Sequence, residues 1–175
     1  FIGLEDMHDA EHAPIPSDKL VFDAAYEELQ RYGNAPMFMF ITTVSTHGPY
    51  TDKDDLGEGD YQQRLAKTLG QFKEFSDKVV RAYPDALIIL AGDHKPGLTR
   101  YLYARNVFKH DDFERIGTRD DNFLFSNRLS LDYRGDVPIY IRHTDAKRLD
   151  TFIRQADTRP FYCFSKLLDD HYTAT

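Results

Sequence analysis

The spacing of apolar residues predicts two long helices in the first part of the chain. Ser17 is a suitable N-cap, because its hydroxyl can accept a hydrogen bond from a free backbone amide of the first turn, and apolar residues then recur at helical spacing up to Tyr32. Gly33 ends this pattern, so we predict a helix over 18–32. A second helix is predicted over 61–83, where apolar residues step by three or four positions and form one stripe: Leu65, Leu69, Phe72, Phe75, Val79 and Tyr83.

Three apolar runs have the pattern of β-strands. Residues 37–44 are apolar or β-branched at both odd and even positions, which is typical of a strand covered on both faces of a parallel sheet. A second such run covers 86–91, and a third covers 137–142, where Pro138 indicates an edge or the start of a strand. Because the first two runs flank the helix over 61–83, we expect a βαβ unit with parallel strands.

The remaining segments complete the fold prediction. A hairpin about Ser126 and Asn127 is expected within the long region 92–136, and helices are predicted over 145–156 and 160–170. The sequence therefore predicts an α/β fold, in which helices cover a mostly parallel sheet.

The composition narrows the classes of partner. The 175 residues include 22 Lys and Arg against 29 Asp and Glu, which gives a net charge of −7 with neutral histidines. This acidic balance argues against a nucleic-acid partner, because nucleic-acid-binding proteins usually present a basic face. No apolar run approaches the roughly 20 residues that a membrane-spanning helix requires. The single cysteine, Cys163, excludes an internal disulfide bond and a zinc site built from several cysteines.

Candidate catalytic and metal-binding residues follow directly after two of the predicted strands. In open α/β sheets, ligands bind beyond the carboxyl ends of the strands. The first strand leads into His47, and the second leads into Gly92, Asp93, His94 and Lys95, so these residues are expected on one rim. The glycine lets the backbone bend, so that the Asp93 carboxylate and the His94 imidazole could turn toward one cation. Such a ligand pair suits Zn²⁺ or Mn²⁺ better than Ca²⁺.

Other interpretations of these residues stay open. A Gly-Asp-His sequence after a strand is commonly a turn in which the aspartate accepts hydrogen bonds from the following backbone. His47 could instead be an ordinary loop histidine. Lys95 could be a solvated side chain, which is more common for a surface lysine than contact with a phosphate. A Ser–His nucleophile pair is disfavoured, because adjacent side chains seldom reach the required geometry. The remaining histidines are expected at the surface: His8, His12, His110, His143 and His171.

Two loop motifs resemble a known family. The segment 35–50 ends in Ser-Thr-His-Gly-Pro-Tyr, and the segment 87–94 ends in Gly-Asp-His. Together with the helix start at 16–23 and the strand at 137–141, they resemble the sulfatase-like phosphoglycerol transferases of the alkaline phosphatase superfamily, which include the lipoteichoic acid synthases. The resemblance spans most of 14–142 in the same order, and the two motifs in combination make it fairly specific.

The resemblance implies metal-dependent transfer of a phosphoryl group of the phosphoglycerol or phosphoethanolamine type. In this family a threonine nucleophile attacks the phosphorus of a phospholipid head group. A divalent metal (Mn²⁺, Zn²⁺ or Mg²⁺) is held by a glutamate, that threonine and an Asp-His pair, which Asp93 and His94 match. His47 matches a histidine that contacts the transferred group, where a donor stabilises developing charge. This match makes His47 a candidate catalytic and substrate-binding residue, with Lys95 as a second substrate-binding candidate.

The departures from the family are also informative. Nothing in the sequence matches the family's nucleophile or its glutamate ligand, which lie upstream in the family, so residues 1–175 would be the C-terminal part of a sulfatase-like catalytic domain and inactive alone. Lys95 and Pro96 stand where members of the family often have Gly, and 98–136 carries no motif of the family.

The location that the resemblance implies is the extracytoplasmic face of a bacterial membrane, periplasmic or extracellular. The implied partner is a phospholipid head group or another phosphate or sulfate ester, with any membrane tether upstream.

Two alternatives differ from this expectation. The chain could come from a sulfatase or phosphodiesterase of the same superfamily that acts on a soluble ester, and the upstream nucleophile would distinguish the two. It could instead be a non-catalytic domain that keeps the fold for binding. In that case Asp93 and His94 would make only hydrogen bonds within the protein.

Overall fold

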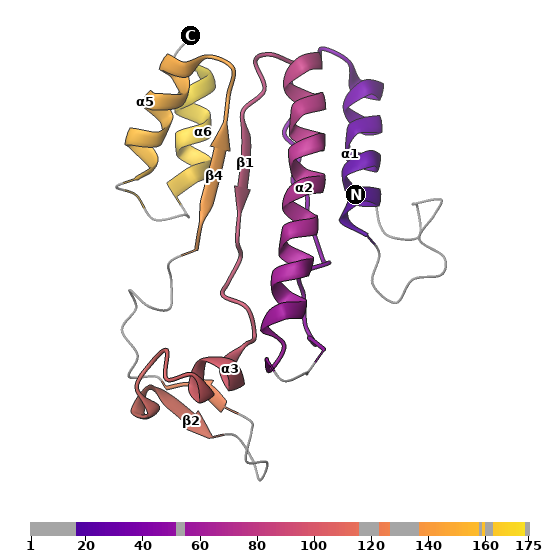
Figure 1. Ribbon diagram of the computed structural model, residues 1–175. Coiled ribbons are helices and arrows are strands. Elements are labelled where there is room, and N and C mark those ends of the chain that lie inside the picture. Colours follow the sequence, from indigo (N-terminus) through magenta and orange to yellow (C-terminus); the bar gives the residue numbers. More distant parts are fainter. Residues whose placement is uncertain are drawn as a thin grey trace. The chain divides into compact units, whose positions relative to one another are not determined.

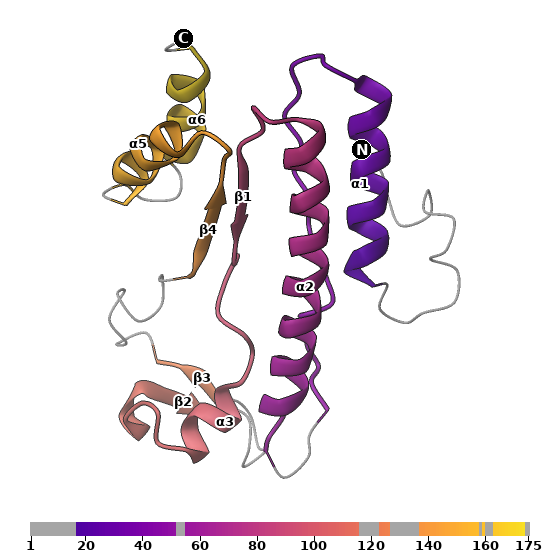
Figure 2. The same ribbon diagram turned by 45° about the horizontal axis from the view of Figure 1, so that its top comes forward.

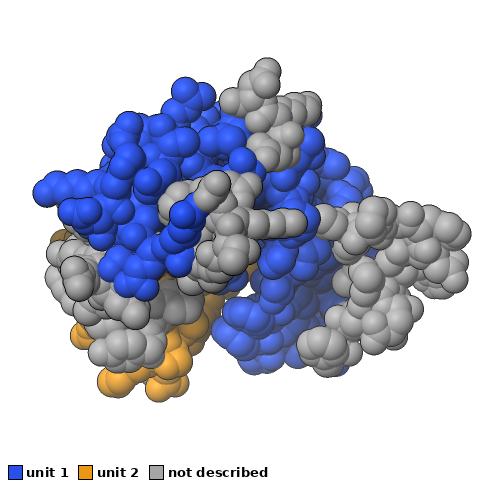
Figure 3. All heavy atoms as spheres, turned by 90° about the horizontal axis from the view of Figure 1, so that it is seen from below, with its two compact units in different colours: residues 1–75, 93–137 blue, residues 76–92, 138–175 orange. Residues whose placement is uncertain are grey.

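The computed structural model describes residues 17–51, 55–115, 123–126, 137–157, 159 and 163–173. The chain divides into two compact units, which Figure 3 shows in different colours. Unit 1 comprises residues 1–75 and 93–137, and unit 2 comprises residues 76–92 and 138–175.

Helix α1 (Asp18–Tyr32) has the bounds that the sequence predicts. The Ser17 side chain caps its start by accepting a hydrogen bond from the backbone N–H of Lys19 across 3.4 Å. At its end Gly33 adopts a φ of +62° and donates its N–H to the carbonyl oxygen of Leu29 across 3.1 Å. A left-handed residue ends a helix at little steric cost only when it lacks a Cβ atom, so this glycine fixes the helix end.

Helix α2 (Glu58–Ala82) contains nearly all of the predicted helix over 61–83 and begins one turn earlier. Glu58 and Asp60 lie in its first turn, where negative charge interacts favourably with the positive end of the helix dipole. No helix in the described ranges is both long enough and apolar enough to cross a lipid bilayer.

The two helices pack against each other in unit 1 through aromatic rings. Phe22 of α1 is 4% exposed, and its ring stacks on Phe75 of α2 with 5.1 Å between ring centroids. Phe72, one turn earlier on α2, contacts the same ring at 6.1 Å. Figures 1 and 2 show α1 lying alongside α2. Burying a large apolar side chain of this kind stabilises the packed state by roughly 1.5–3 kcal/mol.

Residues 37–44 are extended but do not form the predicted buried strand. Within the described part of the chain, no other strand pairs with this segment, and Phe38 and Phe40 are 79% and 81% exposed. The intervening Met39 and Ile41 are partly buried, so only one face of the segment packs against the protein. The apolar pattern identified an extended backbone, but a strand also needs a neighbour to satisfy its hydrogen bonds.

Unit 2 contains a two-stranded antiparallel sheet. Strand β1 (Ile88–Ala91) pairs with strand β4 (Ile139–Arg142), and the register places Ile88 opposite Arg142. Both strands lie inside runs that the sequence predicts as strands. Their residues are only partly buried or exposed, in contrast to the fully buried strands that we expected.

The predicted α/β fold with a mostly parallel sheet is wrong. Both strand pairs in the described ranges are antiparallel, each sheet has two strands, and the structure is predominantly helical. β1 pairs with β4 instead of with residues 37–44, so the predicted βαβ unit does not form. Apolar runs show which segments are extended, but they do not specify which of these segments become neighbours.

Two helices pack with the β1–β4 sheet in unit 2. Helix α5 (Ala146–Ala156) is capped by Asp145, whose carboxylate accepts hydrogen bonds from the backbone N–H groups of Lys147 and Arg148. Helix α6 (Phe164–Thr173) packs against α5, and Figures 1 and 2 show the two helices together beside β4. The core between them contains Phe152, which is fully buried, and Leu167, which is 1% exposed. These helices correspond to the predictions over 145–156 and 160–170, the second beginning later than predicted.

Residues 93–136, most of the long region after β1, lie in unit 1 and contain short elements, of which the sequence analysis predicted only the strand before Ser126, as half of a hairpin. Helix α3 (Thr99–Ala104) and the 3-10 helix η2 (His110–Asp112) precede strand β2 (Phe113–Arg115). Strand β3 (Phe123–Phe125) pairs back onto β2. The second half of the predicted hairpin, after Ser126, lies outside the described residues, as do the first 16 residues with His8 and His12.

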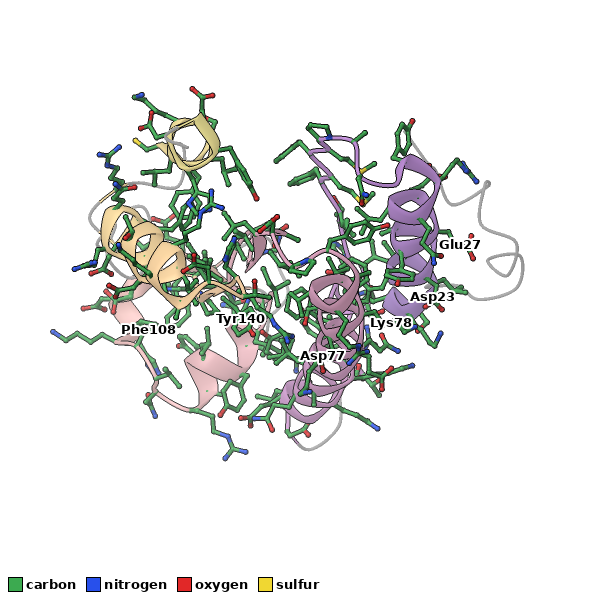
Figure 4. All side chains as sticks on the ribbon, turned by 90° about the horizontal axis from the view of Figure 1, so that it is seen from above. Asp23, Glu27, Asp77, Lys78, Phe108 and Tyr140 are labelled. Atoms are coloured by element: carbon green, nitrogen blue, oxygen red, sulfur yellow. The ribbon has the colours of Figure 1, made fainter. Side chains whose placement is uncertain are left out.

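Aromatic rings form the core of this region. The Phe113 ring of β2 stacks on Phe125 of β3 at 5.2 Å, and Phe108, labelled in Figure 4, meets Phe125 edge-on at 5.3 Å. Tyr103 of α3 lies edge-on to Phe113 at 5.4 Å. The described elements between α3 and β3 therefore share one small aromatic core.

Candidate functional site

The first predicted loop presents His47 from a tight turn. The backbone N–H of His47 donates to the carbonyl oxygen of Val44 across 3.0 Å. The turn is anchored to α1, because the N–H groups of Val44 and Ser45 both donate to Oδ1 of Asp18, at 2.9 Å and 3.0 Å. The position of His47 is thus tied to the first residue of α1.

The imidazole of His47 has a defined tautomer. Its Nδ1 lies 2.6 Å from the carbonyl oxygen of Gly48. A carbonyl oxygen can only accept, so Nδ1 carries the proton in this contact, and in the neutral ring Nε2 has the lone pair. The side chain is exposed, which makes Nε2 accessible to a ligand from solvent.

Arg64 of α2 holds the backbone of the same loop. Its Nη1 donates to the carbonyl oxygen of His47 across 3.1 Å, and its Nη2 donates to that of Pro49 across 3.4 Å. Asp60, one turn earlier on α2, accepts hydrogen bonds from Arg64 Nε at 3.0 Å and Nη2 at 2.7 Å. A fixed guanidinium therefore reaches two carbonyl groups of the loop, on either side of Gly48.

Asp60 completes this anchor from the other side. Its Oδ2 accepts a hydrogen bond from the backbone N–H of Thr51 across 2.7 Å. The hydrogen bonds from Arg64 and from Thr51 hold the pKa of the Asp60 carboxyl below its usual value, because both stabilise the carboxylate. The pair of Asp60 and Arg64 thus acts as a charged clamp on both ends of residues 47–51.

Tyr50 joins the first loop to the second. Its hydroxyl donates to the carbonyl oxygen of Thr46 across 2.8 Å, and its ring meets Tyr61 of α2 edge-on at 5.5 Å. Burial raises the pKa of the Tyr50 phenol, with a further contribution from Tyr61, while Arg64 and a backbone hydrogen bond from Gly97 act in the opposite direction. Because Gly97 belongs to the loop after β1, the two loops that carry the candidate residues are in contact through this phenol.

Gly57 permits this close approach. It has a φ of +91°, and a Cβ atom added to it would lie 2.9 Å from Tyr50 Cβ and 3.7 Å from Leu98 Cδ2. No side chain fits at the shorter distance, so the turn before α2 can pass under Tyr50 only with glycine here. Leu98 is itself 7% exposed and forms the buried base of the second loop.

The second loop brings the side chains of Asp93 and His94 together at its surface. Asp93 Oδ2 and His94 Nε2 lie 3.5 Å apart, and the side chains are 88% and 70% exposed. Two ligands of a tetrahedral ion, each about 2.0–2.2 Å from it, are roughly 3.3–3.5 Å apart, so this spacing fits two ligands of one cation.

The orientation of the His94 ring also fits a metal ligand. Its Nδ1 lies 2.8 Å from the carbonyl oxygen of Lys95, so Nδ1 carries the proton and Nε2 has the lone pair. Histidines that bind metals usually donate their other N–H to a carbonyl or carboxylate in this way. The backbone N–H of His94 donates to Asp93 Oδ1 across 2.9 Å, which leaves Oδ2 as the oxygen nearer to the imidazole.

The structure does not assemble a complete metal site. In the ranges that it describes, no group of three or more His, Cys, Asp or Glu side chains could hold one ion. His47, Asp93 and His94 therefore do not form a shared three-ligand group, although their loops meet through Tyr50. The Asp93–His94 pair supplies two ligands, which suit Zn²⁺, Mn²⁺ or Mg²⁺ only with further donors.

Three residues that support the site were missed by the sequence analysis. Asp18, Asp60 and Arg64 hold the His47 loop, but each lies in a helix, and the resemblance of the segment 16–23 assigns no role to Asp18. The spacing of Asp60 and Arg64 is that of an i,i+4 ion pair, which a helix pattern can reveal. Nothing in that pattern shows that the guanidinium also reaches a loop 15 to 17 residues away.

Two histidines expected at the surface are partly or wholly buried in unit 2. His143 is 6% exposed, and its Nδ1 accepts a hydrogen bond from the backbone N–H of Asp145 across 2.9 Å. Its ring meets that of His171 on α6 edge-on at 5.7 Å. His110 is exposed, as expected, and stacks on Tyr103 at 4.2 Å.

Comparison of the chain with known protein families, with curated proteins and with solved structures finds no match.

Proposed function

We propose that this chain provides two metal ligands and a phosphoryl-binding histidine to a metal-dependent phosphoryl-group transferase or hydrolase. The observation that carries the proposal is the pairing of Asp93 Oδ2 with His94 Nε2 at 3.5 Å, with the His94 ring oriented by the Lys95 carbonyl. The loop motifs around His47 and Asp93 support the same chemistry through their resemblance to the sulfatase-like phosphoglycerol transferases. The proposal does not depend on the parallel-sheet fold, which the structure contradicts.

A divalent ion bound at this pair would supply positive charge to phosphate oxygens and lower the pKa of a coordinated oxygen. Asp93 would provide a hard oxygen ligand and His94 a neutral imidazole ligand. The remaining donors would come from other residues or from the phosphate ester itself, as is common for Mg²⁺ and Mn²⁺ sites. In the proposal, Lys95 contacts the ester as a point charge.

His47 would bind the phosphoryl group as an imidazolium. Because its Nδ1–H is already donated to the Gly48 carbonyl, only a proton on Nε2 can reach a phosphate oxygen. Calorimetry of inorganic phosphate binding measures this contact directly. His47→Gln should weaken the binding, and equal phosphate affinity in this variant and the wild type would contradict the role of His47.

The metal test uses the 175-residue chain and Mn²⁺ alone. Asp93→Asn and His94→Gln should each weaken Mn²⁺ binding by about ten-fold or more, measured by electron paramagnetic resonance. Asp111→Asn and His110→Gln are matched controls, since they change an exposed neighbouring His-Asp pair on η2. Equal Mn²⁺ affinity in the wild type, both Asp93–His94 variants and both controls would overturn the proposed metal role.

A binding domain without catalysis is the second candidate. It is favoured by the absence of a three-ligand group in the described ranges and by the hydrogen bond from the His94 N–H to its neighbour's carboxylate, which is ordinary in a turn. If the wild type binds neither Mn²⁺ nor inorganic phosphate, the Asp93–His94 turn is structural and this second candidate replaces the first. A phosphodiesterase or sulfatase acting on a soluble ester would instead retain Mn²⁺ binding.

A further inference from the structure

Asp18 is a buried carboxylate that serves two helices and a loop. It is the first residue of α1 and is fully buried, with an exposed fraction of 0%. Its Oδ2 accepts a hydrogen bond from the hydroxyl of Thr68, which lies in the middle of α2 and is 5% exposed. Burying a carboxylate costs free energy unless hydrogen-bond donors surround it. The Asp18 carboxylate therefore strongly constrains the positions of the groups that donate to it.

The other carboxylate oxygen binds the loop that leads to His47. Oδ1 accepts the backbone N–H groups of Val44 and Ser45 at 2.9 Å and 3.0 Å. The relation between Asp18 and Ser45 is reciprocal, because the backbone N–H of Asp18 donates to Ser45 Oγ across 3.1 Å. Two hydrogen bonds therefore fix successive peptide groups of the loop against the start of α1, and a third fixes the side chain of Ser45.

These peptide groups determine where His47 lies. The carbonyl oxygen of Val44 accepts the N–H of His47 across 3.0 Å, so the turn begins at the residue whose own N–H binds Asp18. The loop is extended and partly exposed just before this point, and within the described residues no sheet holds it there. The N-terminal anchor of the His47 turn is thus the Asp18 carboxylate, while Arg64 holds its C-terminal side.

We propose that Asp18 is a positioning residue for His47: its buried carboxylate sets the backbone of Val44 and Ser45 and thereby the orientation of the imidazole. Asp18 is fully buried and its carboxylate binds the backbone of the loop, so it acts through the position of His47. The inference rests on the proposed function for the role of His47 in phosphate binding. The orientation of the ring itself can be tested without that function.

The experiment compares Asp18→Asn with the wild type by ¹⁵N nuclear magnetic resonance of the histidine side chains. In the wild type, His47 should show a protonated Nδ1 and an unprotonated Nε2 when neutral. Asp18→Asn replaces one acceptor oxygen with an amide donor and removes the charge, so the single tautomer should be lost. Binding of inorganic phosphate, followed by the His47 signals, should weaken about ten-fold, as for other supporting residues of a site. Asp23→Asn is the control, since Asp23 lies on the same helix, is partly exposed and pairs with Lys19 instead of with the loop.

Thr68 provides a second pair of variants in case Asp18→Asn does not fold. Thr68→Val removes the donor to Oδ2 without touching the loop, and Thr68→Ser restores a hydroxyl. The proposal expects altered His47 signals in the valine variant and wild-type signals in the serine variant. If Asp18→Asn folds, wild-type His47 signals in that variant overturn the proposal. If Asp18→Asn does not fold, wild-type His47 signals in Thr68→Val overturn it instead.

The affinity for Mn²⁺ separates this inference from the proposed function. Asp18→Asn should leave Mn²⁺ binding at Asp93 and His94 within about two-fold of the wild type, because the hydrogen bonds of the carboxylate go to the first loop and to Thr68 of α2 and not to the second loop. A wild type that binds no Mn²⁺ refutes the metal site but not the positioning of His47. An Asp18→Asn variant with unchanged His47 signals and normal Mn²⁺ binding refutes the positioning alone.

Discussion

The guanidinium of Arg64 donates a hydrogen bond to the backbone carbonyl oxygen of His47 across 3.1 Å, so a helix residue holds the loop that presents the candidate histidine. The same side chain donates to Pro49 and is fixed by Asp60 through two further hydrogen bonds. The side chains of Arg64 and Asp60 are 24% and 20% exposed, so solvent screens this pair less than it screens a fully exposed pair. The loop therefore depends on one planar, multiply hydrogen-bonded cation.

Arg64→Lys should destabilise the loop although it keeps the charge. A lysine ammonium cannot span the carbonyl groups of His47 and Pro49 while also binding Asp60 in the fork geometry of arginine. We expect the free energy of unfolding to fall by about 1–2 kcal/mol, measured by urea denaturation, because one charged hydrogen-bond set is lost. Arg81→Lys, in the last turn of α2, is the control and should change it by less than about 0.5 kcal/mol. Equal stability of the two variants would show that the loop does not need the guanidinium.

Two glycines of this region should respond oppositely to the same substitution. Gly57→Ala places a Cβ atom 2.9 Å from Tyr50 Cβ at a φ of +91°, so it should destabilise the protein by about 1–3 kcal/mol. Gly70→Ala lies inside α2 with no atom within 4 Å of the added Cβ, so it should stabilise by about 0.5–1 kcal/mol. Thermal unfolding followed by circular dichroism measures both. A neutral Gly57→Ala would contradict the tight passage under Tyr50.

The four longer helices α1, α2, α5 and α6 were predictable from the sequence because their signals are local. Ser17 and Gly33 are capping residues at the ends of α1, and the apolar stripe of α2 repeats at helical spacing. The positions of β1 and β4 were also indicated by short apolar runs. Capping and periodicity are properties of adjacent residues, so they can be read without knowledge of the rest of the chain.

The sheet was not predictable in the same way. Residues 37–44 and β1 carry equivalent apolar runs, yet only β1 finds a partner, in β4. Strand pairing depends on which segments meet in space. The apolar pattern of a single strand does not show whether that strand will pair in a parallel or an antiparallel direction. The β1–β4 pair, which crosses 47 intervening residues from Gly92 to Pro138, has no local signal at all.

The geometry of the candidate site was only partly predictable from the sequence. Adjacent Asp93 and His94 do approach each other, as their types and the preceding Gly92 suggested. The contacts of Arg64 and Asp60 with the His47 loop, and those of the buried Asp18, could not be inferred, because each joins residues from separate parts of the chain. Long-range polar contacts of this kind leave no periodic pattern in a sequence.

The core of unit 2 should depend on one phenylalanine. Phe152 of α5 is fully buried, and its ring meets Phe164 of α6 edge-on at 6.2 Å. Phe152→Ala should lower the free energy of unfolding by about 3–5 kcal/mol, because it removes apolar contacts and leaves a cavity. Ile153→Ala, at the next position but 43% exposed, should cost clearly less. Similar losses for both variants in urea denaturation would contradict the assignment of this core.

Stability should also depend on the ionisation of His171 on α6. Burial lowers the pKa of this imidazole, and the nearby Arg148 and His143 lower it further. Its ring packs edge-on against Phe152 at 5.5 Å, so the neutral form fits the fold better than the charged form. Unfolding raises the pKa of His171 toward about 6.5, so the unfolded chain binds more protons below that pH.

The sign of the pH dependence follows from this difference. The contribution of His171 to stability is fully present above pH about 6.5 and is lost as the pH falls through its lowered folded pKa. His171→Phe keeps an aromatic ring against Phe152 and removes the titrating group, so its free energy of unfolding should fall less than that of the wild type between pH 7 and pH 5. His110→Gln changes an exposed histidine and should retain the wild-type slope. Urea denaturation at each pH gives the three curves, and parallel curves for wild type and His171→Phe would show that His171 is protonated equally in the folded and unfolded states.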